Sequence, residues 1–131
     1  MALVDAVFLI DLMRGRERAI AVLDTLEDEG EPVCLATTTL AEFFRGLATV
    51  AVSPERKRRI VDAVKGRPLL PLDTGAAQRA GEIDATLWAR GEPIDPEDAA
   101  LAGIALSRDM VLVTRRAREF ERVDGLRLRP Y

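Results

Sequence analysis

Four carboxylic acids stand where an apolar segment ends or a helix begins, and they are the residues best suited to chemistry: Asp5, Glu42, Asp98 and Glu119. The chain has no histidine, and its single cysteine is Cys34. These counts exclude histidine triads, histidine metal ligands, internal disulfides and thiolate metal cages. Catalysis by this chain must therefore use carboxylates, hydroxyls, arginine or a hard cation, and an all-oxygen site selects Mg²⁺ or Mn²⁺.

Each acid also has an ordinary structural role open to it. Asp5 can cap the helix that follows it, and its spacing favours capping and metal binding equally. Glu42 can complete a capping box with Thr39. Asp98 can complement a helix dipole, although it shares that first turn with two other acids, more than a cap and a dipole require. Glu119, taken alone, is best explained as a surface acid paired with a nearby arginine.

The elements around these acids alternate as they do in α/β proteins. Short, wholly apolar segments predict buried strands at 2–4, 33–36, 69–72 and 111–113, with a last strand near 127–128. Helices are predicted over 7–13, 16–29, 37–48, 53–64, 73–90, 95–107 and 117–120. The pattern favours a three-layer α/β/α sandwich with a short, mainly parallel central sheet. Parallel strands share one carboxyl edge, where ligands bind.

Length and composition predict one domain spanning residues 1–131, because no linker or repeat interrupts its 131 residues. The net charge of −3 argues against binding nucleic acid by bulk electrostatics. All but two of the 19 basic residues are arginine, which suits phosphate contacts but is equally explained by a GC-rich genome. No apolar run approaches the ~20 residues that span a bilayer, and no signal peptide is evident, so we expect a cytoplasmic protein.

The order of these segments resembles PIN-domain proteins of the VapC type, the toxins of bacterial and archaeal toxin–antitoxin pairs. The matching pieces are Leu3-Val4-Asp5 with 8–12, 39–46, 91–94 leading to 98–102, 112–115, Glu119-Phe120 and Gly125-Leu126. Each piece is weak alone, whereas their order and spacing together are specific. The resemblance implies a PIN-like fold and hydrolysis of RNA, of the tRNA or rRNA class, by an Mg²⁺- or Mn²⁺-dependent endoribonuclease. It also implies a homodimer and a cognate antitoxin as partners.

By matched position, the resemblance implies that Asp5, Glu42 and Asp98 hold the metal. Glu119 falls where the family usually has aspartate, and it is expected as a fourth catalytic acid. Thr114, at a strand end, is expected to support the acids.

Three departures from the family pattern bear on activity. Ala6 and Val7 replace a usual pair of hydroxyl residues, which removes groups that would position water or phosphate. Arg116 replaces asparagine, so it either grips a phosphate or competes with the metal. Glu119 is one methylene longer than aspartate.

Two alternatives to a nuclease toxin remain. One is a degenerate PIN module that keeps dimer and antitoxin binding but has little or no nuclease activity, as the three departures suggest. The other is a receiver-type phosphoacceptor domain using Asp5; it is disfavoured because Lys57 and Lys65, the only lysines, do not follow the last strand.

Three further residues are expected to be structural. Trp88 is expected in the core or a dimer interface, Cys34 in a buried strand, and Asp11 on a helix rim.

Overall fold

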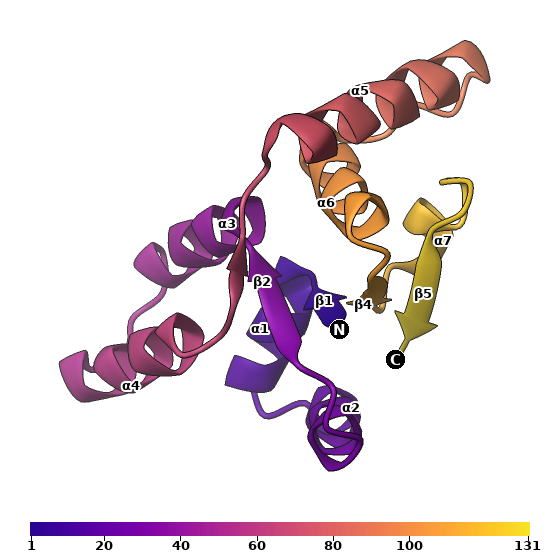
Figure 1. Cartoon of the computed structure of the whole chain (residues 1–131). Helices are drawn as coiled ribbons and strands as arrows, with labels where there is room; N and C mark the ends of the chain where they lie inside the picture. The colour runs from indigo at the N-terminus through magenta and orange to yellow at the C-terminus, as the bar shows by residue number, and fades with distance from the viewer.

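The computed structural model describes residues 1–131, and its five strands form one sheet in which every neighbouring pair is parallel (Figure 1). The strands are β1 (Ala2–Val4), β2 (Val33–Ala36), β3 (Leu69–Leu70), β4 (Val111–Thr114) and β5 (Arg127–Pro130). Their order across the sheet is β3-β2-β1-β4-β5. The chain therefore starts in the central strand, builds one half of the sheet and then returns to build the other.

Seven helices connect these strands and cover both faces of the sheet. They are α1 (Ala6–Met13), α2 (Glu17–Asp28), α3 (Thr37–Ala48), α4 (Pro54–Lys65), α5 (Thr74–Ala89), α6 (Pro96–Ser107) and α7 (Ala117–Phe120). Figure 1 shows α1 to α4 gathered on one side and α5 to α7 on the other. The three-layer α/β/α architecture predicted from the alternation of elements is thus confirmed.

Strands β1 and β2 are apolar at every position because each face of the sheet packs into its own core. Leu3, Cys34 and Leu112 point into the core beneath α5 and α6. Their neighbours on β1 and β2, Val4 and Leu35, belong to the core beneath α1, α3 and α4. Alternate residues of one strand enter opposite cores, so polar side chains such as Thr114 of β4 come only at the carboxyl end of these inner strands.

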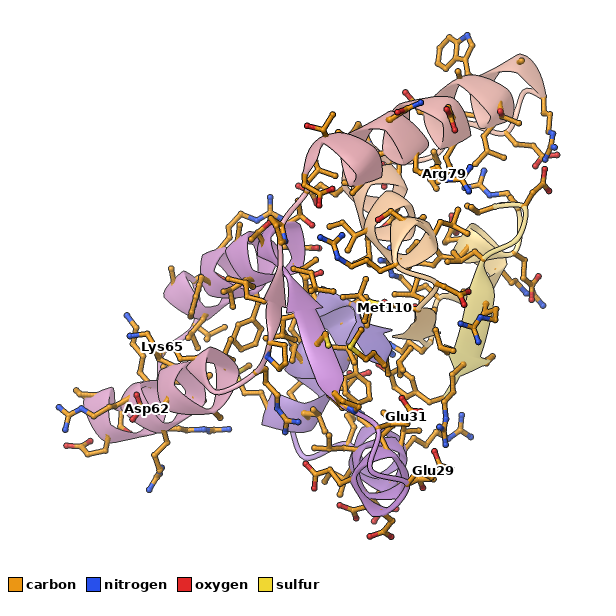
Figure 2. The ribbon with its side chains drawn as sticks, viewed as in Figure 1. Glu29, Glu31, Asp62, Lys65, Arg79 and Met110 are labelled. Carbon is orange, nitrogen blue, oxygen red and sulfur yellow. The ribbon has the colours of Figure 1, made fainter.

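Apolar side chains fill the inside of the fold, and most charged side chains lie on its surface (Figure 2). Met110, labelled within the fold, is 2% exposed and belongs to the core beneath α5 and α6. Asp62 and Lys65 lie on the exposed surface of α4. No helix combines the length and the apolarity that crossing a membrane requires.

Two sequence predictions about elements need correction. The third strand ends at Leu70 instead of Leu72, because Pro71 has no N–H to donate to a ladder at the sheet edge. Trp88, expected in the core or a dimer interface, does not lie in the core: it is 74% exposed near the end of α5. The prediction that Cys34 is buried is confirmed.

Candidate active site

Three strands and one helix bring polar side chains to the carboxyl edge of the sheet. Asp5 follows β1, Glu42 lies one turn into the helix after β2, and Arg116 follows β4, while Asp98 stands in the first turn of α6. These four residues share one small pocket, whose other lining residues are Thr38, Thr39, Glu97 and Leu101. Its free volume of about 10 Å³ admits one water-sized sphere at most. The acids are thus close together, and the remaining space is nearly filled by protein.

Asp5 is held by two hydrogen bonds and is 1% exposed. Its Oδ1 accepts from the backbone N–H of Phe8 at 2.8 Å, and its Oδ2 accepts from the Thr114 hydroxyl at 2.6 Å. Burial raises the pKa of Asp5, while the bonds from Thr114 and Phe8 and the charge of Arg116 oppose that rise. Asp5 is therefore both the cap of α1 and a rigid wall of the pocket, so the two roles that the sequence left equal are compatible.

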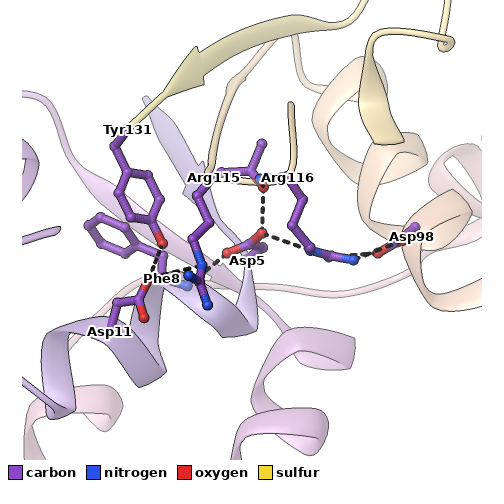
Figure 3. A network of polar contacts seen from close by, with 8 residues as sticks. Asp5, Phe8, Asp11, Asp98, Arg115, Arg116 and Tyr131 are labelled. Atoms are coloured by element: carbon purple, nitrogen blue, oxygen red, sulfur yellow. Dashed lines mark hydrogen bonds and ion pairs between the residues drawn. The ribbon is translucent and has the colours of Figure 1, made fainter. Parts of the chain in front are cut away.

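Arg116 lies between the carboxylates of Asp5 and Asp98 (Figure 3). Its two terminal nitrogens donate to the two oxygens of Asp98 at 3.1 and 2.9 Å, and its Nε lies 3.6 Å from Oδ2 of Asp5. The guanidinium also stands 5.4 Å from the centre of the Phe120 ring. Burial lowers the pKa of Arg116, but the hydrogen bonds and charge of Asp98 outweigh it, so the net shift is upward. Arg116 therefore remains positively charged inside the acidic pocket.

Glu42 does not take part in capping a helix in the folded chain. Helix α3 begins at Thr37, its N-cap residue is Ala36, and no side chain caps it. Thr39 lies inside the helix, so the capping box that the spacing suggested is wrong. Burial raises the pKa of Glu42, and the nearby charge of Glu97 raises it further. A carboxylate that is disfavoured in its charged form and has no capping duty is well placed to bind a cation.

The donor set of this pocket suits a hard divalent ion, because it consists of carboxylate and hydroxyl oxygens. The Thr38 hydroxyl in the pocket wall is buried without a hydrogen-bond partner. As the side chains stand, however, no group of three acids is spaced to hold an ion. Arg116 accounts for this because its guanidinium lies between Asp5 and Asp98. The residues fit the ion chemically, and Arg116 occupies the space between two of the carboxylates.

The structure does not bring Glu119 to this pocket. Its carboxylate is 57% exposed and lies 3.5 Å from Arg122, instead of the arginine expected from the sequence. Asp11 also differs from expectation: it is buried, accepting from the Tyr131 hydroxyl at 2.9 Å. The sequence reasoning missed Thr38 and Glu97 as pocket residues. Glu97 is one of several acids at the start of α6, and only its position near Glu42 distinguishes it.

Comparison with known proteins points in one direction. Residues 2–126 match the PIN domain family. The chain is 40% identical over 97 residues, 73% of each chain, to the tRNA(fMet)-specific endonuclease VapC of Salmonella typhimurium. It is 30% identical over 113 residues to Ribonuclease VapC2 of Haemophilus influenzae, covering 86% of this chain and 85% of that one. The DNA-bound VapBC crystal structure from Salmonella typhimurium superimposes with a TM-score of 0.85 at 30% identity, covering 98% of this chain and 96% of that one.

Proposed function

This chain belongs to the PIN-domain family, and from that premise we propose that it is a metal-dependent endoribonuclease, the toxin of a toxin–antitoxin pair. The observation that carries the proposal is that Asp5, Glu42 and Asp98, far apart in sequence, line one pocket at the carboxyl edge of the sheet. The relatives named as a tRNA endonuclease and a ribonuclease support RNA of the tRNA or rRNA class as the substrate.

Asp5, Glu42 and Asp98 are the proposed ligands of an Mg²⁺ or Mn²⁺ ion, because oxygen donors favour both. A divalent ion held there supplies Lewis-acid activation of water and stabilises charge on a phosphodiester. Asp5 is held in place by Thr114 and the Phe8 N–H, which donate to its two oxygens. Thr114 is therefore proposed as a positioning residue: its hydroxyl donates to Asp5 and accepts from the Arg116 backbone N–H at 2.9 Å.

Arg116 neutralises the carboxylates in the free protein and, when its side chain swings out, is placed to bind a phosphate of the RNA. A guanidinium matches a phosphate as well as it matches a carboxylate, with two parallel hydrogen bonds. The Thr38 hydroxyl, which has no partner in the free protein, can donate to an oxygen of the substrate. Thr38 lies on the same pocket as Asp5, where the chain lacks the usual hydroxyl pair at Ala6 and Val7.

The partners we propose are a cognate antitoxin and a second copy of this chain, in the cytoplasm where the RNA is found. The VapBC complex that superimposes on the chain supports the antitoxin. The exposed Trp88 on α5 supports an interface, since an indole 74% exposed gains from being covered.

The test compares the purified protein with its Asp5→Asn variant on bulk tRNA, with Mg²⁺, with Mn²⁺ and with EDTA. We expect cleavage that EDTA abolishes and that Asp5→Asn lowers by about a hundredfold or more, because the variant removes a fixed ligand charge. Asp62→Asn on the exposed face of α4 is the control, with the same change of charge away from the pocket. Cleavage that continues unchanged in Asp5→Asn would defeat the proposal.

A degenerate PIN module is the second candidate, and the Arg116–Asp98 pair favours it because that pair closes the pocket from within. Titration calorimetry with Mn²⁺ separates the two. Saturable Mn²⁺ binding that Asp98→Asn removes supports the nuclease, whereas no heat of binding at any accessible concentration supports the degenerate module.

A further inference from the structure

A second and much larger cavity, of about 670 Å³, lies at the turn between α1 and α2. Its wall contains four arginines, Arg14, Arg16, Arg18 and Arg115. Two acids, Asp11 and Glu17, also line it, so the cavity carries an excess of positive charge. In a chain whose net charge is −3, this concentration of arginine is local and is not the consequence of a basic protein.

Three of these arginines have no acidic partner. Arg14, Arg16 and Arg18 are exposed, and none of them belongs to any of the ion pairs in the structure. Most of the other arginines lie within 4 Å of a carboxylate, as Arg90 does with Asp124. Unpaired guanidiniums around one cavity repel each other, and an anion that enters relieves that repulsion.

The backbone adds to the attraction for an anion. Helix α2 is 12 residues long, and its N-cap residue, Arg16, makes no side-chain capping bond. Its first-turn N–H groups therefore have no protein acceptor, and they open beside the arginines. Gly15, with φ of 71°, makes the tight turn that brings the end of α1 next to the start of α2.

An independent feature of the wall is the buried carboxylate of Asp11, whose side chain is 4% exposed. Its Oδ2 accepts from the Tyr131 hydroxyl at 2.9 Å and lies 3.3 Å from Nε of Arg115, while its Oδ1 has no partner (Figure 3). Asp11 therefore fixes Arg115 at the cavity and retains an unused acceptor. Asp11 thus accounts for one of the four arginines and leaves the other three for an anion that enters the cavity.

The cavity and the acidic pocket are separate, but neighbouring residues of the chain line them. Arg115 and Arg116 are consecutive: the first pairs with Asp11 in the cavity and the second with Asp98 in the pocket (Figure 3). Asp5, the N-cap residue of α1, and Asp11 within that helix are six residues apart, which is about 9 Å along a helix. A polymer that passes over the pocket reaches the cavity within one or two of its nucleotides.

We propose that this arginine-lined cavity binds a backbone phosphate of single-stranded RNA, next to the bond that is cleaved. This inference rests on the proposed function, because it assigns the cavity to the same substrate. A phosphate seated among Arg14, Arg16 and Arg18 positions the chain, and the acidic pocket acts on a neighbouring linkage.

The experiment measures the binding of a short fluorescein-labelled single-stranded RNA by fluorescence anisotropy, in EDTA so that no cleavage occurs. It compares the wild-type chain with Arg14→Ala/Arg18→Ala. The matched control is Arg58→Ala/Arg59→Ala, which removes the same charge from exposed positions of α4. We expect the cavity variant to bind about tenfold more weakly, and its log–log salt dependence to become shallower by about 1.4, while the control changes by less than twofold.

Equal weakening in the two variants would overturn the inference, since bulk charge alone would then explain the binding. A cavity variant that binds RNA normally but loses binding of a labelled oligoglutamate peptide would overturn it in favour of an acidic protein partner. Cleavage of tRNA with Mn²⁺, run in parallel, separates this inference from the proposed function. If the wild-type chain cleaves tRNA but the cavity variant binds RNA as well as the control variant does, only the inference about the cavity is overturned. If the cavity variant alone binds RNA more weakly but the wild-type chain cleaves no tRNA, the inference about the cavity is supported and the proposed nuclease function is overturned.

Discussion

Arg116 supplies positive charge to a pocket lined by carboxylates. Two carboxylates about 4 Å apart repel by roughly 4 kcal/mol at an effective dielectric of about 20, so Asp5, Asp98 and Glu42 need a positive charge among them. The guanidinium of Arg116 supplies it through two hydrogen bonds to Asp98 and its proximity to Asp5. An arginine that neutralises these carboxylates must oppose the binding of a divalent ion between them.

Replacing Arg116 with asparagine is expected to tighten Mn²⁺ binding about tenfold. A hydrogen-bonded charge pair contributes about 1.5–3 kcal/mol, and removing it releases Asp98 for the ion. Titration calorimetry of Arg116→Asn against the wild type measures this change directly.

Arg118→Asn is the control for that measurement, because Arg118 is exposed on α7, has no ion pair, and loses the same charge. An affinity that rises equally in Arg118→Asn would show that long-range charge is responsible. Weaker Mn²⁺ binding in Arg116→Asn would show that the arginine organises the carboxylates for the ion instead of competing with it.

Residue types and the resemblance to a family were enough to select Asp5, Glu42 and Asp98, but not to describe their surroundings. The burial of Asp11 depends on Tyr131, which lies 120 residues away in sequence. No spacing rule joins such positions, so the sequence predicts Asp11 on a helix rim and not in a buried contact. The same limit applies to Glu119, whose matched position placed it in the site although its side chain points to Arg122.

At the scale of elements, local signals predicted most of the secondary structure. Asp73 and Ser53 cap α5 and α4 through the backbone N–H groups of Ala76 and Arg56, as their positions before helical segments indicate. The strand order could not be obtained in this way, because pairing depends on which apolar segments share a core. The outward position of Trp88 on α5 was likewise decided by packing against α6 and not by the pattern of α5 alone.

The packing of α5 on α6 depends on Gly103, and we expect Gly103→Ala to destabilise the fold by about 1–3 kcal/mol. A Cβ at this position would lie 2.5 Å from the carbonyl oxygen of Ala76 and 2.8 Å from the backbone nitrogen of Ala80. Both obstructing atoms are backbone atoms, so the helices must separate to admit the methyl group. Urea unfolding followed by circular dichroism measures the loss.

Gly81→Ala on α5 is the matched control, because nothing lies within 4 Å of the added Cβ. Alanine is the better helix former by about 0.5–1 kcal/mol, so this variant should be slightly more stable than the wild type. If the free energy of unfolding changed in the same direction in both variants, helix propensity and not the close approach of α5 to α6 would explain the change in stability.

At the scale of the whole molecule, the acidic pocket is the place where its three layers meet. Glu42 comes from α3 in one helical layer, Asp98 comes from α6 in the other, and Asp5 leaves the central strand of the sheet. The two hydrophobic cores on either side of the sheet share no residue, so polar contacts at this edge connect the layers in addition to the sheet itself. An ion bound by all three acids would join both layers to the sheet.

Saturating Mn²⁺ is therefore expected to raise the melting temperature of the entire chain. An ion that binds only the folded state adds about 2.7 kcal/mol at a hundredfold excess over its Kd, which is about 10 °C for a chain of this length. Differential scanning calorimetry with and without Mn²⁺, followed by EDTA, measures the shift and its reversal. Asp98→Asn should abolish the shift, whereas Asp109→Asn, at an exposed turn, should retain it. A shift that survives in Asp98→Asn would mean that the ion binds elsewhere, and the three layers would then be joined without it.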